Sequence, residues 1–241
     1  SPLFRTGEVK KVGYLVICGD KGLAGAYNSN VMKRTLQEIS GKDRSAYALY
    51  VCGKQAKNYL KFRGYDPDTY HFGFSDKPSA QDSIDLSKEM VEYFTKEEVD
   101  EDYIIYTKFI TALRQQVRVD RLLPIEAQAE GKTEEAAKAA ASEWEKERQD
   151  FLRIEEDPYI FLPDAAAVLS KLLPEYIQIQ VYNAMLQSAA SELGSRMAAM
   201  SAATDNATER IADLNLTYNK ARQAQVTNEI SEIVGGAAAL E

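Results

Sequence analysis

The C-terminal third of the chain contains the sequence LQSAASELGSRMAAMSAATDNATERIADLNLTYNKA, residues 186–221. Apolar or small residues return along it at alternating steps of three and four positions. This average spacing of about 3.5 residues is typical of a helix that supercoils with a partner helix along one seam. The seam positions are Leu186, Ala190, Leu193, Met197, Met200, Thr204, Ala207, Ile211, Leu214, Tyr218 and Ala221.

This helix is too long to pack wholly on its own domain. No proline follows Pro174, so a continuous helix is expected from there to Val234, roughly 90 Å long at about 1.5 Å per residue. We expect it to project from the domain and to have its seam buried by another segment. The many alanines and methionines predict a weak grip on that partner. Towards the end the apolar row changes phase, to Val226, Ile230, Ile233 and Ala237.

Length and charge limit the possible classes of protein. The chain has 241 residues, enough for one or two domains with a sizeable core. Its formal net charge is −8, which argues against general nucleic-acid binding and against docking on an anionic membrane surface. No apolar run reaches about 18 residues, so no membrane-spanning helix is expected.

Apolar strand patterns alternate with helix patterns upstream of the long helix. We expect strands at Val12–Cys18, Ala46–Cys52 and Asp102–Thr107, and a half-exposed antiparallel strand at Gln115–Leu123. The helices expected between them are Asn28–Ile39, Gly53–Arg63 and Ser79–Lys96, with a loop or short edge strand at Asp66–Gly73. This alternation predicts an α/β fold with a mostly parallel, Rossmann-like sheet.

The composition divides the chain into two parts. Residues 1–162 are expected to form the α/β domain, and residues 163–241 the long C-terminal helix, which opens at Pro163 or Asp164. The domain carries an insertion rich in alanine and glutamate at about 126–150, with a predicted surface helix at Thr133–Gln149.

Few residues offer chemistry. His71 stands alone in an expected loop and makes no metal site, while Cys18 and Cys52 are expected to be reduced, buried thiols. The turn GDKGLAGAYN (residues 19–28) lacks the Lys-Ser/Thr of a P-loop and the spacing Gly-x-Gly-x-x-Gly. A tight strand-to-helix turn is therefore the favoured interpretation, with nucleotide binding as the alternative. We predict no catalytic residue, cofactor or metal.

Several motifs resemble the γ subunit of F-type ATP synthase. They are GDKGLAGAYN (19–28), RMAAM (196–200), ATDNA (203–207), YNKARQA (218–224) and TNEISEIVGGA (227–237). The resemblance runs from Val12 to the end of the chain, apart from the insertion.

The resemblance implies a non-catalytic rotor shaft. In that family the N- and C-terminal helices form an antiparallel coiled coil inside a ring of α and β subunits, and the α/β domain lies near the ε subunit and the c-ring. The shaft couples ion-driven rotation of the c-ring to ATP synthesis and hydrolysis in the β subunits. The family's N-terminal helix would precede Ser1, so this sequence is expected to lack it. The implied location is peripheral, on the cytoplasmic or equivalent face of an energy-coupling membrane.

The resemblance also implies roles for particular residues. Those expected to meet the catch loops of β are Arg222, Gln223, Thr227 and Glu229. The bearing tip would comprise Ile233, Val234, Ala237, Ala238 and Leu240, and the foot at the c-ring Tyr159 and Phe161. The coiled-coil seam would use Leu186, Leu193, Met197, Met200, Ile211, Leu214 and Tyr218. Gly194 departs from the family's pattern. It stands in the middle of the helix, where glycine costs about 1 kcal/mol relative to alanine.

Two other functions fit the same sequence. One is a coiled-coil adaptor or scaffold with an α/β head and no motor. The other is an α/β enzyme or nucleotide-binding switch that uses the turn at residues 19–25.

Overall fold

The computed structural model describes residue 3, residues 7–125 and residues 165–238. Several predicted features lie outside these residues and stay predictions. They are the insertion at 126–150, the foot residues Tyr159 and Phe161, and Leu240 at the tip.

The α/β domain is built on one five-stranded sheet. The strands are β1 (Val12–Ile17), β2 (Tyr47–Cys52), β3 (Thr69–His71), β4 (Glu101–Thr111) and β5 (Arg114–Leu123), in the spatial order β3-β2-β1-β4-β5. The first four are parallel, and β5 runs antiparallel to β4. The predicted mostly parallel sheet with one antiparallel strand is therefore confirmed.

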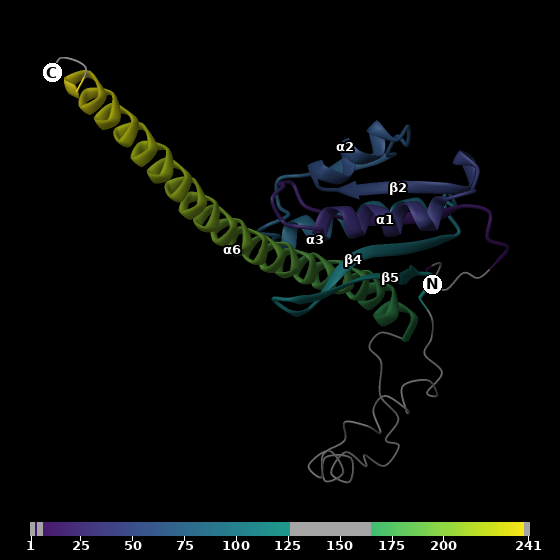
Figure 1. The fold of residues 1–241 in the computed structure, drawn as a ribbon. Coiled ribbons are helices and arrows are strands. Elements are labelled where there is room, and N and C mark those ends of the chain that lie inside the picture. Colours follow the sequence, from purple (N-terminus) through teal and green to yellow (C-terminus); the bar gives the residue numbers. More distant parts are fainter. Residues whose placement is uncertain (1–2, 4–6, 126–164, 239–241) are drawn as a thin grey trace, which may run out of the picture.

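Helices cover both faces of the sheet (Figure 1). They are α1 (Tyr27–Ile39), α2 (Lys54–Phe62), α3 (Ala80–Thr95) and α6 (Ala165–Ala238), with a short 3-10 turn, η2, at Arg44–Ala46. The central strands feed two hydrophobic cores because successive side chains point to opposite faces. In β1, Leu15 and Ile17 join the core under α3 and α6, whereas Tyr14 and Val16 join the core under α1 and α2.

Local signals explain where α3 begins. The Ser79 hydroxyl accepts a hydrogen bond from the Asp82 backbone N–H at 3.2 Å, and the Asp82 carboxylate accepts one from the Ser79 N–H at 2.8 Å. This reciprocal capping box satisfies two N–H groups that the first helical turn leaves unpaired. The predicted helix start near Ser79 is confirmed.

The β4–β5 hairpin is longer than its apolar core. The sequence predicted that the strand would end at Thr107, but β4 continues to Thr111 because pairing with β5 reaches Phe109↔Gln115 and Thr111↔Arg114. The extra residues also meet α6, since the Phe109 N–H donates to the Gln187 side-chain oxygen at 3.0 Å.

His71 is not a loop residue. It ends the edge strand β3, and its Nε2 lies 2.7 Å from the Glu89 carboxylate of α3. This contact joins the edge of the sheet to the helix beneath it. Of the two interpretations of residues 66–73, the short edge strand is the correct one.

Candidate functional site: the projecting helix and its anchor

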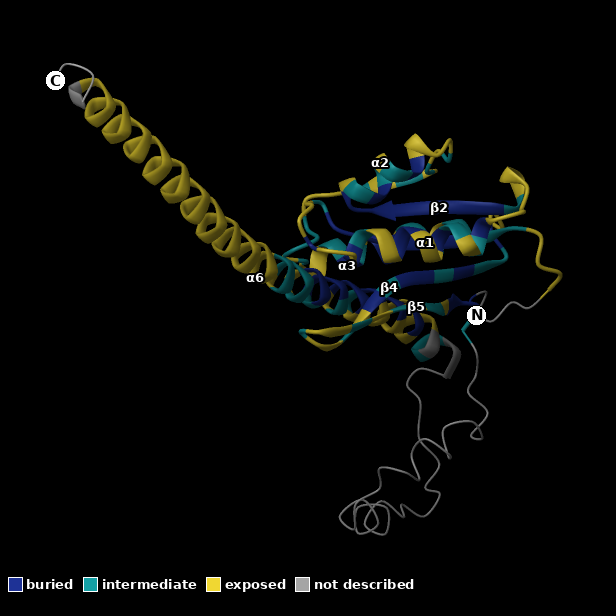
Figure 2. Ribbon diagram, in the orientation of Figure 1, coloured by how far each residue is buried: buried dark blue, intermediate teal, exposed yellow. Residues whose placement is uncertain are grey.

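Helix α6 is much longer than the domain that carries it. Its 74 residues span about 110 Å at about 1.5 Å per residue. The first part packs on β4 and α3 through Ile177, Val181 and Met185, all fully or almost fully buried. Every residue from 201 to 236 is exposed, so the second half stands in solvent, as Figures 1 and 2 show. The prediction of a projecting helix is confirmed.

The predicted seam lies on the side of α6 that faces away from the domain. All seven apolar seam residues are exposed, by between 39% and 66%: Leu186, Leu193, Met197, Met200, Ile211, Leu214 and Tyr218. The row also begins earlier than predicted, because Leu172 and Ile179 are exposed and continue it at intervals of seven residues. One side of this part of the helix therefore packs on the sheet while the other side presents the seam.

The last turns of α6 carry a second apolar row. Val226, Ile230, Ile233 and Val234 are exposed. At about 100° per residue they are rotated from the end of the seam by roughly a third of a turn. The four residues predicted to meet β lie in the same exposed segment: Arg222, Gln223, Thr227 and Glu229. Their roles depend on contacts with other subunits, so they stay predictions. Ala237 and Ala238 are the last two residues of α6.

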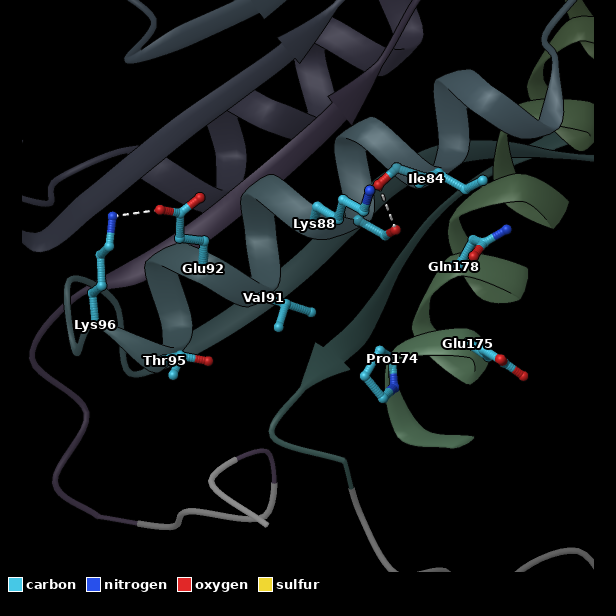
Figure 3. Close-up of a pocket in the computed structure, with 10 residues that line it drawn as sticks. Ile84, Lys88, Val91, Glu92, Thr95, Lys96, Pro174, Glu175 and Gln178 are labelled. Atoms are coloured by element: carbon cyan, nitrogen blue, oxygen red, sulfur yellow. Dashed lines mark hydrogen bonds and ion pairs between the residues drawn. The ribbon is translucent and has the colours of Figure 1, made fainter. Parts of the chain in front are cut away.

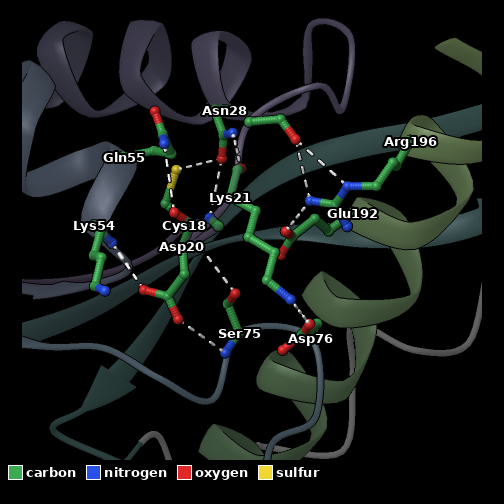
Figure 4. Close-up of polar contacts among 12 residues, drawn as sticks. Cys18, Asp20, Lys21, Asn28, Lys54, Gln55, Ser75, Asp76, Glu192 and Arg196 are labelled. Atoms are coloured by element: carbon green, nitrogen blue, oxygen red, sulfur yellow. Dashed lines mark hydrogen bonds and ion pairs between the residues drawn. The ribbon is translucent and has the colours of Figure 1, made fainter. Parts of the chain in front are cut away.

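A polar anchor fixes α6 where it leaves the domain (Figure 4). Glu192 is 0% exposed, and its Oε1 accepts a hydrogen bond from Arg196 Nη2 at 2.6 Å. The Arg196 guanidinium also contacts the Gly22 carbonyl oxygen at 3.4 Å. A side chain at Gly19 would lie only 2.9 Å from the Glu192 carboxylate, so this glycine allows the helix and the turn to meet.

The β4–β5 hairpin holds a neighbouring side of the same helical segment. The Ser195 hydroxyl donates to Gln115 Oε1 at 2.5 Å, and the Ser191 hydroxyl donates to the Thr107 carbonyl oxygen at 3.2 Å. Gly194 lies against Ala112, where an added Cβ would stand 3.4 Å from backbone atoms of the hairpin. The mid-helix glycine that departed from the family pattern thus lets the hairpin approach α6 closely.

Sequence reasoning missed the anchor. The spacing places Glu192 and Arg196 on the polar surface outside the seam, and this is wrong for Glu192, which is buried. The available signal was the small residues at 188–191 and 194–195. Small side chains in a helix allow the backbone of a neighbouring segment to come close to it. The Glu192–Arg196 spacing of four residues also allowed an ion pair.

The glycine-rich turn uses its polar groups internally. Asn28 Oδ1 accepts from the Gly19 N–H at 3.0 Å and from the Cys18 thiol. The Asp20 carboxylate accepts from the Lys54 N–H at 3.0 Å and from the Gly73 N–H at 2.7 Å. Because the Asp20 carboxylate already occupies the N-terminus of α2, where a phosphate would bind, this geometry argues against a nucleotide cradle.

The two cysteines behave as core residues. Both are free and buried, as predicted. Burial raises the pKa of the Cys18 thiol to about 12 and also raises the pKa of Cys52, so both stay protonated and unreactive. Among the described residues, no group of three or more His, Cys, Asp or Glu side chains could hold a metal ion.

A groove of about 520 Å³ runs between α3 and α6 (Figure 3). Its apolar lining includes Ile84, Val91 and Pro174, and charged side chains such as Lys88 and Glu175 stand at its margin. No histidine or cysteine is among the residues that line it. Within the described parts of the chain, no helix is both long and apolar enough to cross a membrane.

Solved structures share this fold. A chain of the Euglena gracilis mitochondrial ATP synthase, in a structure of OSCP, F1 and c-ring, aligns with a TM-score of 0.67 and 23% identity, covering 96% of this chain and 73% of that one. A chain of the Tetrahymena thermophila mitochondrial ATP synthase, in a structure of central stalk and c-ring, aligns with a TM-score of 0.61 and 22% identity, covering 83% and 79%.

Sequence comparisons identify the family. The family described as ATP synthase matches residues 1–240. The ATP synthase gamma chain of Staphylococcus aureus strain JH9 is 38% identical over 242 residues, covering 100% of this chain and 77% of the relative. The gamma chain of Staphylococcus epidermidis is 37% identical with the same coverage. With this identity over its whole length, the chain belongs to the ATP synthase gamma chain family.

Proposed function

We infer that this chain is the central-stalk rotor of an ATP synthase and couples rotation of a membrane c-ring to ATP synthesis and hydrolysis in other subunits. The observation that carries the inference is the long exposed helix, whose apolar seam points away from its own domain. A monomer gains nothing from exposing such a row, since each buried apolar side chain contributes about 1.5–3 kcal/mol. The row therefore fits a helix that works inside a larger assembly.

The seam is the surface for a second helix in an antiparallel coiled coil. The residues that carry it are Leu186, Leu193, Met197, Met200, Ile211, Leu214 and Tyr218. We propose that the family's N-terminal helix covers this row. The partner would also cover Leu172 and Ile179, so the coiled coil would extend down beside the head and not end at its edge.

The polar residues near the tip provide the coupling. Arg222, Gln223, Thr227 and Glu229 project from a rigid helix, so their directions change as the shaft turns. Contacts on one side of an asymmetric shaft favour one conformation of a β subunit at a time. Rotation then becomes a sequence of changes in the nucleotide affinity of the β subunits. A contact shifts a conformational equilibrium only when it binds one of the two conformations more tightly than the other.

The remaining assignments follow from this role. The tip, with Ile233, Val234, Ala237, Ala238 and Leu240, would turn in an apolar sleeve of the α and β subunits. Tyr159 and Phe161 would contact the c-ring near the ε subunit. Residues 1–162 would form the head and 163–241 the shaft. The chain would be non-catalytic and peripheral to the membrane, on the cytoplasmic or equivalent face.

Co-assembly tests the proposal. The chain, together with the family's N-terminal helix, is mixed with ATP synthase α and β subunits. We expect one complex of defined size with cooperative ATPase activity. Ile211→Asp should prevent assembly because it places a charge on the seam, whereas Asn206→Asp, at an exposed position outside the seam, should not. A chain that stays apart from competent α and β subunits would instead support the adaptor function.

A further inference from the structure

Three lysines line one side of helix α2. Lys54, Lys57 and Lys61 are spaced by three and four residues, which places them on one helical side. Among the described residues, none of the three forms an ion pair with a carboxylate. We call them the α2 lysine row. Cations gathered in this way without a carboxylate partner stand out on a chain whose net charge is −8.

Two aromatic rings hold two of these lysines in place. Tyr70 in the edge strand β3 and Phe72 just after it stack with their centroids 6.0 Å apart and their planes at 11°. Lys57 Nζ lies 3.3 Å from the centroid of Tyr70, and Lys54 Nζ lies 5.1 Å from that of Phe72. The rings remain half exposed, at 47% and 50%. The ammonium groups of Lys54 and Lys57 are thus positioned by cation–π contacts.

Lys57 and Lys61 act on the same ring. Hydrogen bonding from Lys57, and then the charges of Lys57 and Lys61, lower the pKa of the Tyr70 hydroxyl. The edge strand and the lysine row therefore form one continuous patch.

We propose that the α2 lysine row, with Tyr70 and Phe72, docks a carboxylate-rich segment of a partner protein. The row spans roughly 10 Å, so it matches carboxylates spaced by three and four residues on a helix. Because Lys54 and Lys57 are held before binding, they lose less side-chain entropy when they form ion pairs. Aromatic rings beside cations also suit a protein interface, where Tyr and Phe are enriched.

A protein segment fits this patch better than an anionic bilayer. The net charge of −8 would repel a broad anionic surface, whereas a narrow acidic segment meets only the local cations. Helix α2 covers the opposite face of the sheet from α6, as Figure 2 shows. The partner would therefore bind the head without competing for the seam of the shaft.

This inference rests on the proposed function, because the partner is expected within the assembled ATP synthase. The test replaces Phe72 with the photo-crosslinking residue p-benzoylphenylalanine in the assembled complex, reconstituted in vesicles of phosphatidylcholine and phosphatidylserine. We expect mass spectrometry to find Phe72→p-benzoylphenylalanine joined to a peptide with several closely spaced Asp or Glu residues. The same residue at Leu113, 88% exposed on the β4–β5 hairpin, should give a different product.

Lysine neutralisation makes the test specific. Combining Lys54→Gln, Lys57→Gln and Lys61→Gln should lower the crosslink yield about tenfold, as expected for losing three weak ion pairs. Combining Lys33→Gln, Lys77→Gln and Lys108→Gln removes the same charge from other exposed sites and should leave the yield unchanged. Equal yields in both triple variants, labelled lipid, or a peptide without acidic residues would overturn the inference while the complex still assembles. Failure of the unsubstituted chain to assemble would overturn the proposed function as well.

Discussion

The buried carboxyl of Asp102 makes stability depend on pH in an unusual direction. Asp102 is 0% exposed in β4, beside Gly13 of β1, and neither carboxylate oxygen has a hydrogen-bond partner among the described residues. Burial raises its pKa from 3.8 to about 8. The folded protein therefore keeps this carboxyl neutral at pH 7, while the unfolded chain ionises it.

The size of the effect follows from linkage. Between pH 3.8 and about pH 8, the Asp102 carboxyl must take up a proton when the chain folds. The free energy of unfolding therefore falls as pH rises through this interval, by about 1.4 kcal/mol per pH unit, and levels off above it. From 3.8 to pH 7 is about three pH units, so Asp102 costs up to about 4 kcal/mol at pH 7 and almost nothing near pH 4.

Asp102→Asn keeps the shape and removes the ionisation. Relative to the unsubstituted protein, the variant should gain up to about 4 kcal/mol at pH 7 and nothing near pH 4. Urea unfolding, followed by the near-ultraviolet circular dichroism of the tyrosines in the head, measures this difference. Asp43→Asn, at an exposed site, is the control and should give no such pH-dependent gain. The reasoning is refuted if Asp102→Asn and the unsubstituted protein show parallel pH profiles.

Three further predictions concern the anchor, the edge strand and the tip. Arg196→Met should destabilise the protein by about 3 kcal/mol, because it leaves the buried Glu192 carboxylate without its partner. The control is Arg210→Met at an exposed site, which should change the free energy of unfolding by less than about 0.5 kcal/mol in the same urea titration. Hydrogen bonding to Glu89 raises the pKa of His71 above its value in the unfolded chain. The His71–Glu89 contact therefore stabilises the protein fully below the pKa of His71 in the unfolded chain, and this contribution is lost as the pH rises through the pKa of His71 in the folded protein. His71→Gln should therefore lower the melting temperature more at acidic than at alkaline pH, and a constant difference would contradict this. Arg222→Ala combined with Gln223→Ala should impair ATPase coupling in the complex with almost no change in stability, and equal losses of helicity and activity would point to a structural role instead.

Much of the fold could be predicted because its signals are local. The apolar run at 12–18 predicted a central strand, and alternate residues of that run do feed the two cores. The heptad spacing from Leu186 to Ala221 predicted which side of α6 would stay uncovered by the domain. Its lower end was missed, because Leu172 and Ile179 stand in a part of the helix that also packs on the sheet.

The anchor could not be predicted because it depends on contacts distant in sequence. Glu192 resembles any polar helix residue until the turn at Gly19–Gly25 folds over it. Gly194 resembled a defect until the hairpin tip came into contact with it. The roles of Arg222, Gln223, Thr227 and Glu229 depend on other chains, so they stay predictions.

The central claim is that this chain turns as a shaft, and rotation tests it most directly. A Lys33→Cys label at an exposed position of α1 can carry a bead, because Cys18 and Cys52 are buried and would not react. The α and β subunits of the assembled complex are fixed to a surface and ATP is added. We predict stepwise rotation of the bead in one direction. A complex that hydrolyses ATP while its head stays still would contradict the account.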